Sequence, residues 1–121
     1  MVRFKDPIKA NKAALCMEQR TKNDQIGYGV NDYRSLYYVA KKVNWNLSKI
    51  TTNVNTVCSI FVSVCINASG VSITKDLNGF DCNVKQNLIN TKEFEVMKYN
   101  KNKLMRGVVL IIKCQHTGMA L

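Results

Sequence analysis

Two residues of this sequence have side chains and positions suited to catalysis, Cys58 and His116. The chain contains five cysteines and a single histidine. Cys58 lies near the start of a stretch, residues 57–70, that predicts a short helix with apolar side chains on nearly every face, and such a helix belongs inside a domain. A cysteine in the first helical turn lies near unpaired N–H groups and the positive end of the helix dipole, which stabilise a thiolate. Cys58 is therefore either an ordinary core cysteine or a nucleophile.

Both ends of this central helix carry sequence signals. Thr56 is the predicted N-cap, and Gly70 is the predicted left-handed residue after the last turn. The polar residues Ser59, Ser63 and Asn67 are spaced by four, so they form one narrow stripe on a helix that is otherwise apolar.

The remaining cysteines are predicted to be reduced and mostly buried thiols. Seven residues separate Cys58 from Cys65, so their Cα atoms lie about 10 Å apart by helical rise, which is too far for a disulfide. The sequence has no CxxC pair and only one histidine, so we expect no metal site and no cofactor. The other three cysteines are Cys16, Cys82 and Cys114.

The elements that must position Cys58 and His116 follow from periodicity. Helices are predicted over residues 6–22 and 32–43, joined by a glycine-containing loop over 23–29. A short helix and three strands follow the central helix, and the nearly all-apolar strand 108–113 is predicted to be central in a sheet. This order predicts an α+β domain with the central helix packed across an antiparallel sheet. The start of that helix can then face a histidine on an adjacent strand. The elements predicted after the central helix are 81–90, 93–99, 108–113 and 116–121.

Length and hydropathy indicate a single domain without a membrane span or a secretory signal. A chain of 121 residues with 46% hydrophobic residues is long enough for one domain with one core. The longest apolar run, residues 108–112, is far too short to span a membrane, and the N-terminus lacks the apolar core of a secretory signal. We therefore expect synthesis in the cytoplasm without a signal peptide.

The net charge favours polyanionic partners. It is +10, from 18 basic and 8 acidic side chains, and such a field attracts nucleic acid, anionic lipid head groups or acidic wall polymers. The sequence has no Lys/Arg-rich block and no zinc-finger spacing, so charge alone does not indicate a nucleic-acid-binding protein.

The residues around Cys58 resemble a known family. Residues 58–70, Cys-Ser-Ile-Phe-Val-Ser-Val-Cys-Ile-Asn-Ala-Ser-Gly, resemble the Asp-Cys-Ser-Ser-apolar-Val…Cys…Asn-Ala-Ala-Gly signature of NlpC-type papain-like cysteine hydrolases, in the branch of phage and prophage endolysins. Residues 104–110 and 116–121 resemble the Leu-x-Arg-Gly-Asp-apolar…Gly-His-Thr strand pair of that branch. Upstream, residues 23–28 and 40–52 are also similar to it, so the resemblance covers residues 14–121.

The resemblance implies a papain-like peptidoglycan hydrolase that cleaves an amide in the wall peptide, or between sugar and peptide. Cys58 would be the nucleophile and His116 the general base. Tyr28, in the loop before the second helix, would be a neighbour of the substrate or of the oxyanion. The implied partner is bacterial cell-wall peptidoglycan, reached by a monomer after lysis or a holin releases it.

The chain departs from the family pattern near both residues. Val57 stands where the family has Asp, Ile60 replaces its second Ser, Val108 replaces the Asp of Arg-Gly-Asp, and Gln115 replaces Gly. The third polar residue, which orients the imidazole, is expected on the strand after the histidine, and the sequence ends five residues past His116.

These departures predict a single catalytic-type domain, residues 1–121, that is truncated at the C-terminus and impaired in activity. No cell-wall-binding domain follows it in this sequence. One alternative is a non-catalytic remnant or wall-binding module with the same fold. A second alternative is a small basic protein that binds nucleic acid.

Overall fold

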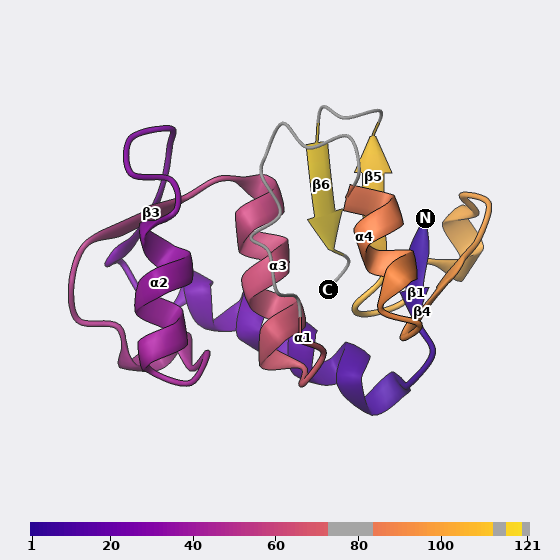
Figure 1. Ribbon diagram of the computed structural model, residues 1–121, viewed down its shortest axis with the longest axis horizontal. Helices are drawn as coiled ribbons and strands as arrows, with labels where there is room; N and C mark the ends of the chain where they lie inside the picture. The colour runs from indigo at the N-terminus through magenta and orange to yellow at the C-terminus, as the bar shows by residue number, and fades with distance from the viewer. Residues whose placement is uncertain (73–83, 113–115, 120–121) are drawn as a thin grey trace.

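The computed structural model describes residues 1–72, 84–112 and 116–119 (Figure 1). Helices and strands are interspersed along these ranges, and two of the connections contain a single-turn 3₁₀ helix. The elements are β1 Val2–Phe4, α1 Pro7–Thr21, β2 Ile26–Tyr28, α2 Ser35–Lys42, the 3₁₀ turn Leu47–Lys49, β3 Val54–Thr56, α3 Cys58–Ala68, α4 Val84–Asn90, β4 Phe94–Val96, the 3₁₀ turn Lys101–Lys103, β5 Val109–Ile112 and β6 His116–Met119.

The strands form two small sheets on opposite sides of α3 (Figure 1). One is a four-stranded sheet with the order β4-β1-β5-β6, and all of its pairs are antiparallel. The other is a parallel pair of β2 and β3. The mixed composition with a mainly antiparallel sheet agrees with the predicted α+β class.

Most of the predicted elements are confirmed. The helices predicted over 6–22 and 32–43 are α1 and α2, although α2 begins later, at Ser35. The strand predicted as central is β5, which lies between β1 and β6. Parts of the later predictions, residues 81–83, 113–115 and 120–121, lie outside the described residues, and so do Cys82, Cys114 and Gln115.

One prediction about the connections is wrong. Residues 23–29 were expected to be a loop, but Ile26–Tyr28 form β2, which pairs in parallel with Val54–Thr56. The N-terminal strand β1 was not predicted either. Each of these strands has three residues, which is too short for the apolar alternation that marks a strand in a sequence.

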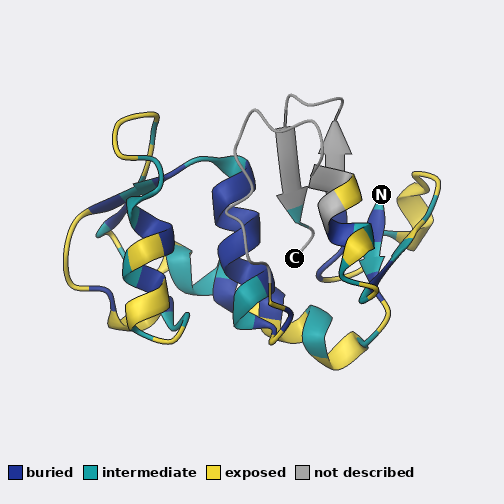
Figure 2. Cartoon of the chain, in the orientation of Figure 1, coloured by how far each residue is buried: buried dark blue, intermediate teal, exposed yellow. Residues whose placement is uncertain are grey.

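The central helix α3 is buried along nearly its whole length (Figure 2). It packs against α1, α2 and β6, and its residues from Ser59 to Ile66 are all buried. Gly70 follows it with a φ of +98°, which confirms the predicted left-handed residue after the helix.

The predicted N-cap of α3 is wrong by one residue. Val57, in an extended conformation, is the N-cap, and its side chain makes no capping hydrogen bond. Thr56 belongs to β3, and its hydroxyl donates instead to the carbonyl oxygen of Val57 at 3.2 Å. The pairing of β3 with β2 holds the chain extended through Thr56, so the helix can begin only at Cys58.

Two residues of the polar stripe of α3 form hydrogen bonds within the helix. The Ser63 hydroxyl donates to the Ile60 carbonyl at 2.7 Å, and the Asn67 side-chain amide donates to the Ser63 carbonyl at 2.9 Å. Such bonds to the preceding turn allow hydroxyl and amide groups to lie in a core. The stripe is therefore part of the packing of α3.

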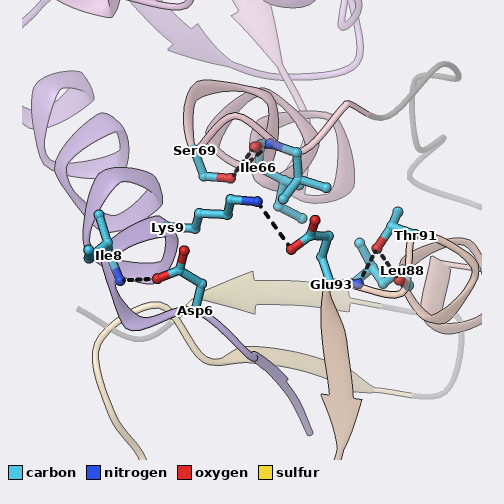
Figure 3. A network of polar contacts seen from close by, with 9 residues as sticks. Asp6, Ile8, Lys9, Ile66, Ser69, Leu88, Thr91 and Glu93 are labelled. Atoms are coloured by element: carbon cyan, nitrogen blue, oxygen red, sulfur yellow. Dashed lines mark hydrogen bonds and ion pairs between the residues drawn. The ribbon is translucent and has the colours of Figure 1, made fainter.

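Helix α1 packs against α3 and also contacts β1 of the four-stranded sheet. It begins with Pro7 in the first turn and with the Asp6 carboxylate accepting the Ile8 N–H at 2.9 Å, as is typical of a helix start. Its buried face, with Ala13, packs on α3. Figure 3 shows Lys9 reaching Glu93, just before β4, in an ion pair of 3.2 Å.

The segment before β5 is fixed directly on α1. Arg106 forms an ion pair of 2.6 Å with Glu18. Gly107 has a φ of +87°, and a Cβ atom there would lie 2.7 Å from the Ala10 carbonyl oxygen. Close approach of backbone to backbone thus sets where β5, and the strand β6 paired with it, lie relative to α1 and α3.

Candidate active site

Cys58 is the first residue of α3 and the most accessible of the cysteines that the structure describes. It is half-buried and free, whereas Cys16 and Cys65 are buried. The turn that it begins has no side-chain cap from Val57. Cys58 is therefore an accessible thiol in the first turn of the central helix, where the sequence predicted it.

Tyr28 lies directly beside Cys58. Strand pairing brings them together, because Tyr28 is opposite Thr56 in the β2–β3 register and Cys58 is two residues further along the chain. The Gly29 N–H continues this pairing with a hydrogen bond of 3.1 Å to the Thr56 carbonyl. The tyrosyl hydroxyl hydrogen-bonds with the Cys58 side chain and also accepts the Cys58 backbone N–H.

The surroundings of Tyr28 favour its protonated form. Burial raises the pKa of Tyr28 above its usual value, and the charge and side-chain hydrogen bond of Cys58 raise it further. The Cys58 backbone N–H and the Arg20 guanidinium act in the opposite direction. Tyr28 as a whole is 54% exposed, so the residue is only partly buried. At neutral pH the phenol is a hydrogen-bond donor.

The backbone of His116 stands at the first position of β6, paired with Ile112 of β5. Helix α3 packs against β6, and both elements begin at the same, upper end of the view in Figure 1. The fold therefore brings the start of the cysteine-bearing helix and the start of the histidine-bearing strand to one end of the molecule.

Arg20 is a residue of this region that the sequence did not single out. It comes from the last turn of α1, and its guanidinium carbon lies 5.6 Å from the centre of the Tyr28 ring and 5.5 Å from that of Phe61. Phe61 is one helical turn after Cys58. No local pattern indicates this placement, because a basic residue in the last turn of a helix is ordinary.

Two of the residues that differ from the signature described above lie in the hydrophobic core. Ile60 is fully buried and Val108 is 1% exposed. Val57 is the extended residue before α3. The polar groups of the family pattern are thus replaced at Ile60 and Val108 by core side chains.

Trp45 and a cavity lie at the other end of α3. Its ring packs edge-on against Tyr37, with centroids 5.3 Å apart, and both line a cavity of about 490 Å³ that also includes Asn67. Asn67 is nine residues along the helix from Cys58, or about 14 Å away by helical rise. This cavity is separate from the Cys58 region.

No group of three or more His, Cys, Asp or Glu side chains within the described residues could hold a metal ion. No helix within the same ranges is long and apolar enough to cross a membrane.

Comparison with known proteins identifies the family. An endolysin-like domain matches residues 1–121. Neither the curated proteins nor the solved structures contain a significant match. The chain therefore belongs to the endolysin-like domain family, and this membership indicates a phage-lytic, peptidoglycan-directed role.

Proposed function

We propose that the chain is a cysteine amidohydrolase of peptidoglycan, with an NlpC-type papain-like arrangement in which Cys58 is the nucleophile and His116 the general base. The position of Cys58 carries the proposal. It is an accessible thiol at the start of a buried helix, hydrogen-bonded to Tyr28, at the end of the molecule where β6 begins with His116.

The chemistry is acyl transfer through a thioester. The Cys58 sulfur attacks the carbonyl carbon of a wall amide while His116 holds the thiol proton. The tetrahedral intermediate then expels the amine, which takes that proton from His116, and water hydrolyses the thioester. The Tyr28 hydroxyl, protonated at neutral pH, donates a hydrogen bond to the carbonyl oxygen as it gains negative charge.

The direct test is release of amines or peptides from purified Gram-positive walls. Wild type should release them, and Cys58→Ala and His116→Ala should not. Tyr28→Phe should lower kcat by about 10- to 1,000-fold, the usual effect of removing one donor from an oxyanion. Cys65→Ala is the matched control, because Cys65 is a fully buried thiol on the same helix and is not assigned to the site.

Two outcomes would reject the catalytic proposal. One is wild-type protein that releases nothing from any wall tested. The other is a Cys58→Ala variant that is as active as Cys65→Ala, which would mean that the reaction does not need this thiol.

A second candidate function, a wall-binding module without catalysis, is favoured by the buried Ile60 and Val108 that replace polar residues of the family pattern. In that case both wild type and Cys58→Ala should sediment with insoluble walls to the same extent, and neither should release soluble fragments. Retention on walls together with fragment release by wild type alone would exclude this candidate.

A further inference from the structure

Arg20 connects three elements around Cys58. It projects from α1, and its guanidinium lies over two rings, Tyr28 from β2 at 5.6 Å and Phe61 from α3 at 5.5 Å. Tyr28 is hydrogen-bonded to Cys58, and Phe61 is one turn along the same helix. The positive charge of Arg20 is therefore held between two rings, one from the residue that is hydrogen-bonded to the thiol and one from the helix that carries it.

The Arg20 charge has no acidic partner among the residues that the structure describes, since none of their carboxylates lies within ion-pair distance. Its Nε atom is buried and makes no hydrogen bond within the described part of the chain. Buried donors without an acceptor are uncommon in folded proteins, and a guanidinium without a carboxylate partner can pair with an anionic ligand through its terminal N–H groups.

The chemistry of the guanidinium defines that ligand. Arginine presents several N–H donors in a planar fork that matches the two oxygens of a carboxylate. A merely structural role explains the ring contacts equally well, because any long side chain could fill the space between Tyr28 and Phe61. That role does not require a charge, and the two explanations therefore differ in a measurable property.

We propose that Arg20 forms an anion subsite beside Cys58 that holds a carboxylate of the substrate. The substrate class is then a wall peptide with a free carboxylate close to the scissile amide, in preference to a peptide in which that carboxylate is amidated. This inference rests on the proposed function for the identity of the substrate. The anion subsite itself is testable without any wall cleavage.

The test compares two alkylating reagents of similar size at Cys58. Iodoacetate is an anion and iodoacetamide is neutral, and both react with the thiolate, so the ratio of their rates does not depend on how much thiolate is present. In wild type, at fixed ionic strength, the ratio of iodoacetate to iodoacetamide should be higher than in the urea-unfolded chain. Arg20→Gln and Arg20→Met should lower the folded ratio by about five- to tenfold, as loss of one nearby charge predicts.

Lys22→Gln is the matched control, because Lys22 is exposed and lies two residues after Arg20, so this variant removes one positive charge outside the proposed subsite. The ratio in Lys22→Gln should stay within twofold of wild type, and Arg20→Lys should keep most of it. Arg20→Met retains an unbranched side chain between the two rings and keeps the test available if Arg20→Gln does not fold. If folded and unfolded wild type give equal ratios, or if both Arg20 variants match Lys22→Gln, the subsite does not exist.

A second measurement identifies the substrate and separates the two proposals. Wild type should cleave stem peptides with a free carboxylate more efficiently than their amidated forms, and Arg20→Met should lose this preference through a higher KM for the free acid alone. If wild type cleaves no peptide but the alkylation ratio depends on Arg20, the proposed function fails and the anion subsite stands. Cleavage of both peptides with an unchanged preference in Arg20→Met would reject the subsite as a determinant of substrate.

Discussion

The contact between Gly107 and α1 predicts a large loss of stability in Gly107→Ala. A Cβ atom at this position would lie 2.7 Å from the Ala10 carbonyl oxygen and 2.9 Å from the Ala10 Cβ, and the φ of Gly107 is +87°. Both contacts are tighter than van der Waals packing permits. The added methyl group therefore forces β5 away from α1 or distorts the helix.

The magnitude follows from two independent contributions. A side chain at a left-handed φ costs about 1–2 kcal/mol, and one extra methyl in a closely packed contact destabilises by about 1–3 kcal/mol. The free energy of unfolding should therefore fall by about 2–5 kcal/mol, a large part of the 5–15 kcal/mol typical of a domain. At about 4 °C per kcal/mol for a chain of this size, Tm should fall by roughly 8–20 °C.

Urea unfolding followed by circular dichroism measures this difference, and Gly29→Ala is the control. Gly29 has no heavy atom within 4 Å of an added Cβ and does not have a positive φ, so its substitution should change the free energy of unfolding by about 0.5 kcal/mol at most. If Gly107→Ala is as stable as Gly29→Ala, the approach of β5 to α1 is not as close as described, and the resulting placement of β6 beside α3 loses its basis.

Three further predictions concern the thiols and Tyr28. Iodoacetamide should modify Cys58 before Cys16 and Cys65, which are 3% and 0% exposed; equal labelling of all three under native conditions, read by mass spectrometry, would contradict the described burial. Burial and the neighbouring Cys16 raise the pKa of the Cys65 thiol well above its usual value of 9.0. The folded state then binds this proton more tightly than the unfolded state, so its contribution to stability declines as pH rises above about 9, and Cys65→Ala should flatten the decline. By the same reasoning, the raised pKa of Tyr28 predicts that the free energy of unfolding declines less with pH in Tyr28→Phe than in wild type above about pH 10. Equal slopes of the free energy of unfolding against pH in the two proteins would contradict this prediction.

Periodicity predicted the elements that are long enough to show it. The helices α1, α2 and α3 bury one or more faces over several turns, and apolar residues recur at helical spacing along them. The strands β1, β2 and β3 have only three residues each. Their pairing joins distant segments, Val2 with Val96 and Tyr28 with Thr56, and no local pattern encodes it.

The same distinction applies to the candidate site. The position of Cys58 at the start of α3 was predictable because that helix has a strong local pattern, whereas the roles of Tyr28 and His116 were inferred from family resemblance and stay predictions. Arg20 was not predictable, because its role depends on two rings that come from β2 and α3. The contact between Tyr28 and Cys58 likewise depends on the register of two strands that the periodicity does not reveal.

Gly27 tests whether that register positions the site. It pairs with Asn55 in the middle of the β2–β3 pair, and an added Cβ would meet the Asn55 Oδ1 atom. The Asn55 side chain cannot turn away freely, because its Nδ2 donates to the Asn31 carbonyl at 2.9 Å. Gly27→Ala should therefore break this bond or shift β2, and a shift of β2 would move the Tyr28 hydroxyl away from Cys58.

We expect Gly27→Ala to lose at least as much wall cleavage as Tyr28→Phe, with a loss of stability of about 1–3 kcal/mol. Asn55→Ala in the Gly27→Ala background removes the clash and should restore part of the activity; no recovery, with both variants folded, would mean that the strand pair does not set the position of Tyr28.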